Sequence, residues 1–333
     1  MRILCFANNS PERWWRLDMP KKWIERNTDW RIDIVDLSRW TSGLEGYDLI
    51  IGRSFISEKV VDTIHSWGVK ILYEIDGAEP LLSDEHFANL KTAYGRDAHK
   101  HLMGTMQKCD AVLVSTLPLA EWIGSFVRRP IVLFPNYMDF EWWDNHACER
   151  GVSGGEIRLG WFGMRSHVFD IQNILVPIIE KLRLIYPCTF YIPESVVHII
   201  PSHLRSHIHA VPQWKMHERP SLARKYMIDI MLVPLEPTGF NACKSAIKYY
   251  ENGADEIPGI YSPTVYSSYV RHGKTGYIAD TLDEWMCALN SLSSKKTRKN
   301  IGKRAYQDVR ANYNATNRYQ EWVNAIQSVY EQS

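Results

Sequence analysis

Several signatures that define other classes of protein are absent from this chain of 333 residues. Its six cysteines are scattered, with no C-x-x-C pair and no spacing typical of a metal site, which indicates reduced thiols in a cytoplasmic protein. No apolar run approaches the ~18 residues that a membrane-spanning helix requires. The apolar start of the chain ends at Asn8, too soon for a signal peptide. We therefore expect a cytoplasmic protein without a membrane span.

The sequence also lacks the short motifs of several enzyme classes. It contains no G-x-x-x-x-G-K-[ST] and no G-x-G-x-x-G, which argues against P-loop NTPases and dinucleotide-dependent oxidoreductases. The 12 histidines include no H-E-x-x-H and no other metal-ligand spacing, so no metal site is predicted. The formal net charge is only +1, so the protein as a whole has no positive field that would attract nucleic acid. Only a local basic patch would bind nucleic acid electrostatically.

The composition is that of an ordinary globular protein. Hydrophobic residues make up 45% of the sequence and charged residues 23%, which argues against a disordered or fibrous chain. At ~100–200 residues per domain, the length suggests two domains. The 13 tryptophans suit either a large core or surfaces that stack on sugars and bases.

Short apolar runs alternate with helical patterns along the chain. This alternation is typical of parallel sheets with helices on both faces, so we expect an α/β fold of two doubly wound, Rossmann-like domains facing a cleft. The Gly/Ser-rich stretch 150–155 is the best linker candidate. It divides the chain into a first domain at 1–150 and a second domain at 151–316, with a final helix in 317–333. The expected strands are 2–7, 30–36, 48–52, 69–74, 111–115 and 130–134, then 157–162, 189–192, 208–211, 228–234, 259–261 and 276–278.

One segment of the second domain carries a chemical signal. The strand 228–234 runs into a Gly-containing loop that opens a helix expected at 242–252. The free N–H groups and the dipole of such a helix start form an anion site. Lys244 lies in the expected first turn and Lys248 one turn later, which suits a diphosphate, and Glu251 follows where it would accept hydrogen bonds from ribose hydroxyls. An ordinary amphipathic helix with solvated lysines is the alternative.

The same segment resembles a known family. The run F-N-x-x-K-S-x-x-K-x-x-E, from Phe240 to Glu251, is followed by G-x-x-x-I-P and a strand, and looks like the C-terminal domain of retaining GT-B glycosyltransferases. Many members carry E-x7-E here, and Glu251 matches the second Glu, which in that family binds the donor ribose. Cys243 stands where the first Glu would be, so the chain resembles a Lys-Ser variant of the group.

The resemblance extends over most of residues 150–330. The stretch 157–167 looks like the strand and loop that open the family's C-terminal domain, where Arg165 is the candidate for contact with the donor phosphates. The turn at 270–276 matches V-x-H-G-x-T-G, and the last helix matches the one that crosses back to the N-terminal domain. The D-x-D motif of metal-dependent glycosyltransferases is absent, so the resemblance implies transfer without a metal ion.

The resemblance also implies roles for individual residues. The expected reaction is a hexosyl or pentosyl transfer in which Arg165, Lys244 and the helix start stabilise the departing diphosphate. Asp76 is expected either to orient a sugar or acceptor hydroxyl or simply to cap a strand end, and no nucleophile is assigned. No cofactor is expected, because the nucleoside-diphosphate sugar is a co-substrate. The catalytic candidates are Arg165, Lys244 and Asp76, and the donor-binding candidates are Gly163, Phe240, Asn241, Ser245, Lys248 and Glu251.

The segment after the first strand is the expected acceptor loop. Its aromatic side chains are interleaved with Arg and Lys, which suits stacking on sugar rings or on bases between phosphates. The acceptor-binding candidates are Asn9, Ser10, Trp14 and Trp15. The acceptor is left open between a glycan, a small molecule, a lipid-linked sugar and DNA, as in phage enzymes that glycosylate hydroxymethylated pyrimidines. A non-catalytic nucleotide-sugar-binding protein and a GT-B epimerase are the alternatives to a transferase.

Overall fold

The computed structural model of the chain divides into two compact units. It describes residues 1–8, 10–40, 43–53, 56–78, 81, 96–149, 151 and 155–331. The first unit consists of Met1–Tyr137, Ala242–Ser245 and Ala315–Ser333, and the second of Met138–Asn241 and Ala246–Asn314. Residues 138–149 therefore pack with the second unit, although the composition predicts a boundary near residue 150.

The first unit is built on a six-stranded parallel sheet. Its strands are β1 (Arg2–Phe6), β2 (Arg31–Val35), β3 (Leu49–Arg53), β4 (Lys70–Ile75), β5 (Ala111–Val114) and β6 (Ile131–Leu133). Their order is β2-β1-β3-β4-β5-β6, so the chain reverses direction across the sheet between β1 and β3. The central strands are buried almost throughout, which explains why they read as continuous apolar runs in the sequence.

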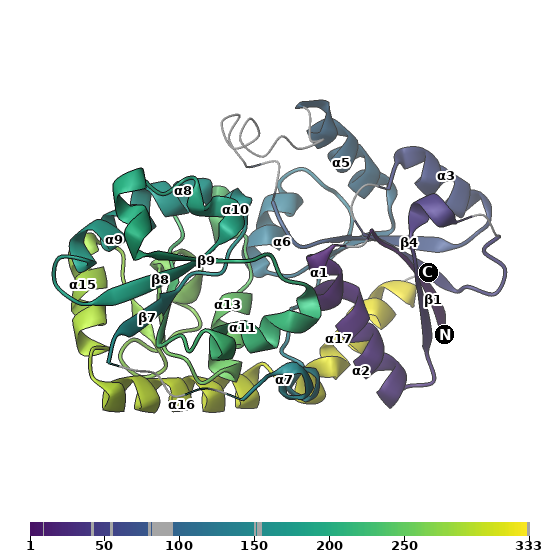
Figure 1. The fold of residues 1–333 in the computed structure, drawn as a ribbon. Coiled ribbons are helices and arrows are strands. Elements are labelled where there is room, and N and C mark those ends of the chain that lie inside the picture. The colour runs from purple at the N-terminus through teal and green to yellow at the C-terminus, as the bar shows by residue number, and fades with distance from the viewer. Residues whose placement is uncertain are drawn as a thin grey trace. The chain divides into compact units, whose positions relative to one another are not determined.

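Helices cover this sheet. They are α1 (Pro11–Arg13), the π-helix η1 (Trp14–Asp18), α2 (Met19–Asn27), the 3₁₀-helix η2 (Leu37–Arg39), α3 (Glu58–Ser66), α5 (Arg96–Lys108), α6 (Leu117–Gly124) and α17 (Ala315–Tyr330). The C-terminal helix α17 lies against α2, although about 290 residues separate them in the sequence (Figure 1). The C-terminal helix of the chain is thus part of the first unit.

The expected acceptor loop is helical, which corrects the sequence-based expectation. Helical structure runs without a break from Pro11 through η1 to the end of α2. The reason is burial: Trp15, Leu17 and Trp23 all turn into the core and tie the segment down along its length. Trp15 is only 6% exposed, so its ring is part of the core rather than an open stacking surface.

The second unit repeats the architecture. Its strands are β7 (Ile157–Gly160), β8 (Cys188–Pro193), β9 (Ile208–Val211), β10 (Ile230–Val233), β11 (Gly259–Tyr261) and β12 (Tyr277–Ile278). Their order is β12-β11-β10-β7-β8-β9, again all parallel, and it reverses between β7 and β10. All twelve strands expected from the apolar runs are present, and the α/β class with two doubly wound sheets is confirmed.

Helices flank the second sheet as well. They are α7 (Phe140–His146), η4 (Arg165–His167), α8 (Val168–Asp170), the π-helix η5 (Ile171–Leu175), α9 (Val176–Leu182), α10 (Glu194–Val197), η6 (Ser202–His207), η7 (Met216–Glu218), α11 (Arg219–Lys225), α12 (Gly239–Ala242), α13 (Ile247–Ala254), α14 (Pro263–Tyr266), α15 (Leu282–Ser291) and α16 (Lys295–Asn312). One core under this sheet is packed from Leu, Ile and aromatic side chains of β7, β8, α9 and α15. No helix in the described part of the chain is long and apolar enough to cross a bilayer.

The helix expected at 242–252 is interrupted, which is a second correction. Helix α12 ends at Ala242 and α13 begins only at Ile247, so Lys244 and Ser245 lie in a non-helical connection. In the first unit, Thr116 Oγ1 donates a hydrogen bond to the carbonyl oxygen of Cys243 at 2.8 Å. A continuous helix would use that carbonyl for its own ladder, so a tertiary contact overrides the local helical pattern. Lys244 and Glu251 therefore do not share one helix face.

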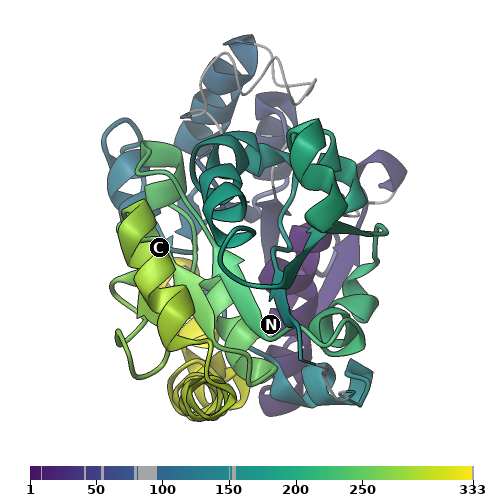
Figure 2. The same ribbon diagram turned by 60° about the vertical axis from the view of Figure 1, so that its left-hand side comes forward.

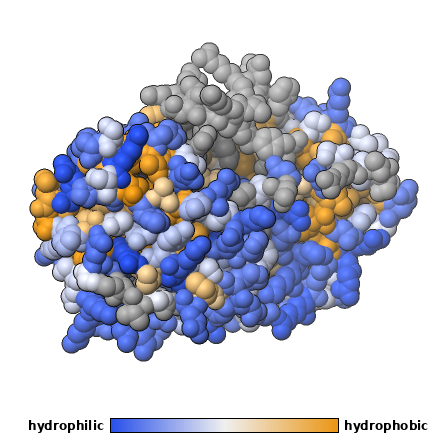
Figure 3. All heavy atoms as spheres, viewed as in Figure 1, coloured by the Kyte–Doolittle hydropathy of each residue, from blue (hydrophilic) through white to orange (hydrophobic). Residues whose placement is uncertain are grey.

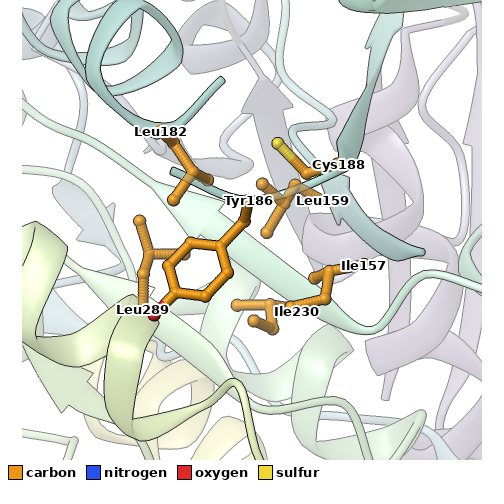
Figure 4. A pocket seen from close by; sticks show the side chains of 7 residues that line it. All are labelled: Ile157, Leu159, Leu182, Tyr186, Cys188, Ile230 and Leu289. Carbon is orange, nitrogen blue, oxygen red and sulfur yellow. The ribbon is translucent and has the colours of Figure 1, made fainter. Parts of the chain in front are cut away.

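A small cavity of about 10 Å³ lies within the core of the second unit (Figure 4). Its lining is formed by Ile157, Leu159, Leu182, Tyr186, Cys188, Ile230 and Leu289. The space is at the lower limit for one water molecule, and its walls are almost wholly apolar. Ile157 and Cys188 are the first residues of their strands, so the cavity lies at the end of the sheet opposite to the one that binds ligands in such folds. We interpret it as a packing gap.

Close packing of α16 on the end of α13 gives a first prediction. A Cβ atom added at Gly302 would lie 1.9 Å from the carbonyl oxygen of Glu256, a backbone atom that cannot rotate away. Gly302→Ala should therefore destabilise the fold by about 1–3 kcal/mol, as overpacked cores do. Urea denaturation of the purified variant measures this difference.

Gly155→Ala is the matched control, since no atom of the described residues lies within 4 Å of a Cβ added there. We expect its unfolding midpoint to stay at the wild-type value. Equal midpoints for Gly302→Ala and the wild type would contradict the observed contact between α16 and the residues after α13.

Candidate functional site

The strand order of the second unit locates its ligand-binding edge. Ligands of doubly wound sheets bind beyond the carboxyl ends of the strands at the point where the strand order reverses. In this sheet the reversal lies between β7 and β10. The segments 161–167 and 234–241 follow those two strands. They contain four of the predicted donor-binding or catalytic residues: Gly163, Arg165, Phe240 and Asn241.

A buried carboxylate, Asp170, ties these two segments together. Its Oδ2 lies 2.7 Å from Nδ1 of His167 in the segment after β7. Its Oδ1 accepts hydrogen bonds from the backbone N–H of Glu236 at 2.7 Å and from Nδ2 of Asn241 at 3.0 Å. Asn241 also donates to the carbonyl of Glu236. Asn241 is thus a loop-positioning residue in this structure, and Asp170 fixes the shape of the edge.

The principal charged cluster of the second unit is centred on Glu251 of α13. Arg219 Nη2 donates to Glu251 Oε2 at 2.6 Å, and Lys248 Nζ donates to the same oxygen at 2.9 Å. The side chains of Arg219 and Glu251 are each only 4% exposed, whereas Lys248 is half-buried. The cluster therefore places two cations and one carboxylate largely out of water.

This arrangement keeps Glu251 ionised. Burial alone would raise the pKa of Glu251, but Arg219 and Lys248 outweigh burial and hold the pKa below its ordinary value. Both donors use Oε2, and Oε1 accepts no hydrogen bond from the residues that the structure describes. An ionised carboxylate accepts about four hydrogen bonds in total, so Glu251 retains capacity for a ligand hydroxyl.

Arg219 also retains capacity for a ligand. Its Nε and Nη1 are buried and have no hydrogen-bond partner among the described residues. The guanidinium carbon lies 5.8 Å from the ring centroid of Trp143 and 5.5 Å from that of Phe162, so aromatic faces hold the group in place. A buried charged donor without an acceptor is costly, which is the pattern of a site whose acceptors come from a ligand.

The first unit has a comparable cluster at the ends of β3 and β4. Glu74 is fully buried and pairs with Arg16 Nε at 2.6 Å and with Nη1 of Arg53. Burial would raise the pKa of Glu74, but Arg53 and Arg16 together hold it below the ordinary value. Arg16 comes from η1, so this ion pair network ties the helical segment after β1 to the sheet.

Asn136 extends this network to two predicted site residues. Arg16 Nη1 donates to Asn136 Oδ1 at 2.9 Å, which leaves the amide nitrogen of Asn136 as a donor. That nitrogen donates to Asp76 Oδ1 at 3.2 Å and to Ser245 Oγ at 2.9 Å. Burial raises the pKa of Asp76 above its ordinary value. The carboxylate of Asp76 and the connection that carries Lys244 are thus held by one amide.

The remaining predicted residues are placed as follows. Arg165 begins η4, but its side chain lies outside the described part of the structure. Lys244 is half-buried in the connection before α13. Gly163 packs closely, since a Cβ there would lie 2.5 Å from the ring of Trp161, and Phe240 is buried. Ser10 and Trp14 are half-buried, whereas Asn9 lies outside the described residues. No three His, Cys, Asp or Glu side chains group as a metal site within the described ranges.

Several residues of these clusters carry no signal in the sequence. Arg219 stands in an unremarkable helix start. Arg16 lies among Trp and Lys residues that read as a surface patch, yet it is fully buried. A charged residue inside an apolar strand, as at Glu74, is the one hint that was open to sequence reasoning, because such residues are buried only when paired.

Comparison with known proteins gives structural similarity alone. No protein-family model and no curated protein matches the sequence. Sucrose-phosphate synthase from Thermosynechococcus elongatus aligns over 100% of both chains with a TM-score of 0.72 and 11% identity. HepE of Anabaena, solved with UDP-glucose, aligns over 98% of this chain and 100% of its own, with a TM-score of 0.66 and 12% identity. A glycosyltransferase from Rickettsia africae aligns over 100% and 99%, with a TM-score of 0.66 and 12% identity.

The chain has the GT-B fold. Full-length alignment with these three structures and two parallel six-stranded sheets establish it. At 11–12% sequence identity, the similarity establishes the fold alone. The roles of individual residues therefore rest on the contacts that those residues make in this structure.

The Glu251 cluster predicts a pH-dependent contribution to stability. Because the folded pKa of Glu251 lies below its ordinary value of 4.5, its ion pairs stabilise the fold fully above about pH 4.5, and this contribution is lost as the pH falls through the folded pKa. Glu251→Gln removes the charge at every pH. The stability difference between wild type and variant should be largest near pH 7 and shrink on acidification, as measured by chemical denaturation at each pH.

Glu121→Gln is the control, because Glu121 is exposed and forms no ion pair with the described residues. It should unfold like the wild type at each pH. A stability difference for Glu251→Gln that stays constant between pH 7 and acid would show that Glu251 gains nothing from its two cations.

Proposed function

We propose that this protein is a glycosyltransferase that binds a nucleoside-diphosphate sugar in its second unit and transfers the sugar to an acceptor hydroxyl. The observation that carries the proposal is the incompletely paired cluster of Arg219, Lys248 and Glu251 in a GT-B fold. Glu251 has one carboxylate oxygen, and Arg219 two guanidinium nitrogens, without a hydrogen-bond partner among the described residues, so the pair is suited to a ligand rich in hydroxyls and oxyanions.

Glu251 is proposed to receive the ribose. Its free Oε1 would accept hydrogen bonds from vicinal hydroxyls, while Oε2 stays bound to Arg219 and Lys248. The depressed pKa matters for this role, since a protonated carboxyl would accept fewer hydrogen bonds. The resemblance of the segment from Phe240 to Glu251 to the family's ribose-binding stretch supports the same assignment.

The diphosphate is proposed to bind near the start of α13. The first N–H groups of any helix have no acceptor within the helix, and the dipole favours an anion there. Ser245 and Lys244 precede that start by a few residues, and Arg165 is the second proposed cation. When the bond between the anomeric carbon and the diphosphate oxygen breaks, these groups would stabilise the leaving diphosphate, without a metal ion. Retention at the anomeric carbon is proposed from the family resemblance.

The acceptor is proposed to bind the first unit. Ser10 and Trp14 follow β1, which is one of the two strands between which the strand order reverses in this sheet. Asp76 follows β4 and is held by Asn136, so it is suited to orient an acceptor hydroxyl. Since Trp15 is in the core, stacking on an acceptor would fall to Trp14.

UDP-glucose is the first donor to test, since HepE, which shares the fold, was solved with it. Losing a hydrogen bond to a charged group costs about 1.5–3 kcal/mol, so Glu251→Gln should weaken nucleoside-diphosphate binding about tenfold or more. Lys244→Ala should weaken binding of the diphosphate more than of the bare nucleoside. Isothermal titration calorimetry on folded variants measures both effects.

Glu121→Gln and Lys295→Ala are controls that change exposed residues of the same types. Both should keep the wild-type affinity. If Glu251→Gln and Lys244→Ala also keep it while remaining folded, the α13 region is only scaffold and the proposed donor site is wrong.

Metal independence gives a separate prediction. The sequence has no D-x-D motif, so sugar transfer should survive EDTA at full rate. Loss of transfer on chelation that Mn²⁺ restores would overturn this part of the proposal. The same assay distinguishes a transferase from a non-catalytic nucleotide-sugar-binding protein, which would bind the donor but neither transfer nor hydrolyse it.

A further inference from the structure

An open groove of about 530 Å³ lies on the second unit, and none of the residues that line it belongs to the Glu251 cluster. One wall is the turn that includes Arg271 and Lys274, and the other is the C-terminal half of α16. The groove is lined by Arg271, Lys274, Thr275, Arg304, Gln307, Asp308, Ala311 and Asn312. Asp308 is the one acidic residue of this lining, and Arg271 neutralises it through an ion pair of 2.9 Å.

Helix α16 continues the positive charge beyond the groove. Its sequence, KKTRKNIGKRAYQDVRAN, contains a single carboxylate and basic residues along its whole length. Three arginines of α16 and the neighbouring turn form ion pairs with carboxylates: Arg271 with Asp308, Arg298 with Asp229 and Arg310 with Asp144. Six exposed cations form no ion pair with any residue that the structure describes, namely Lys274, Lys295, Lys296, Lys299, Lys303 and Arg304.

The geometry of α16 makes these cations a linear array. The helix has 18 residues, which at 1.5 Å per residue is about 27 Å. Figure 2 shows it nearly end-on, with its turns superimposed, so it is close to straight. Its apolar residues Ile301, Ala305 and Val309 are buried, and α16 packs on α13. The exposed side chains of α16 are polar or charged apart from Ala311, and Figure 3 shows a hydrophilic surface along the lower edge.

We propose that this groove and the outer face of α16 bind the phosphodiester backbone of a nucleic acid. About 27 Å of helix matches roughly eight nucleotides of one strand at 3.4 Å each, so a regular polyanion would meet the cations one after another. A single small anion would engage only a few of them. A membrane surface is disfavoured, because interfacial helices insert large apolar side chains, and the exposed large hydrophobic residues of the described chain all lie outside α16 and the groove.

The inference stands apart from the proposed transferase activity. None of its cations belongs to the Arg219, Lys248 and Glu251 cluster, so nucleic acid binding requires no nucleotide sugar. The two proposals can therefore fail independently, since donor affinity measures one and nucleic acid affinity the other.

The test is fluorescence anisotropy of labelled 20-base-pair DNA and RNA duplexes, titrated with the full chain over a range of salt concentrations. Contact with about six phosphates predicts a slope of log K against log salt near −5. Lys274→Glu combined with Arg304→Glu should weaken binding about tenfold or more and reduce the magnitude of the slope by about 2. The duplex that binds more tightly identifies the kind of nucleic acid.

Lys59→Glu combined with Lys225→Glu is the matched control, with the same change in net charge at two exposed lysines outside the groove and α16. It should keep most of the affinity and the wild-type slope, and both double variants should bind the donor normally. If both double variants weakened nucleic acid binding equally, net charge alone would explain the effect, and the proposal would be overturned. A flat salt response would also overturn it, as would binding of the chain to vesicles of anionic phospholipid but to neither duplex.

Discussion

The site of the second unit depends on one interaction, the pairing of buried Glu251 with Arg219 and Lys248. Taking a carboxylate and a guanidinium out of water costs several kcal/mol per ion, and their attraction offsets this cost only when hydrogen bonding is nearly complete. Here it is incomplete, because one carboxylate oxygen and two guanidinium nitrogens have no partner in the described chain. A buried network left open in this way is poorly explained by stability alone and well explained by a ligand that completes it.

The first unit shows the same physics with a different result. Both carboxylate oxygens of Glu74 accept hydrogen bonds, one from Arg16 and the other from Arg53, and Arg16 in turn donates to Asn136. The segment Ala242–Ser245, which runs from the end of α12 toward α13, belongs to this unit and is held by hydrogen bonds to Asn136 and Thr116. The segment that carries Lys244 is therefore shaped by residues more than 100 positions away in the chain. Any account of phosphate binding by Lys244 has to include those contacts.

The sequence predicts the fold well, because buried parallel strands are short apolar runs that alternate with amphipathic helices, and all twelve strands follow from that pattern. It predicts the helical break at Cys243 poorly, because Thr116, whose hydroxyl donates to the Cys243 carbonyl in place of a helical N–H, is remote in sequence. It misreads Trp15 and Arg16 as surface residues, since local composition does not reveal which side chains face the core. The motif marks Glu251 as a candidate, whereas its ion-pair partner Arg219, in a helix 32 residues earlier, has no motif to mark it.

The central claim is that Glu251 accepts a hydrogen bond from the ribose of a nucleoside diphosphate. The most direct measurement is a double-mutant cycle by calorimetry, in which wild type and Glu251→Gln are each titrated with UDP and with its 2′-deoxy and 3′-deoxy analogues. The account predicts that removing the contacted hydroxyl costs the wild type about tenfold in affinity and costs the variant much less, because glutamine offers the hydroxyl only a neutral acceptor. An equal loss in both proteins would mean that the hydroxyl and Glu251 do not interact, and would contradict the account.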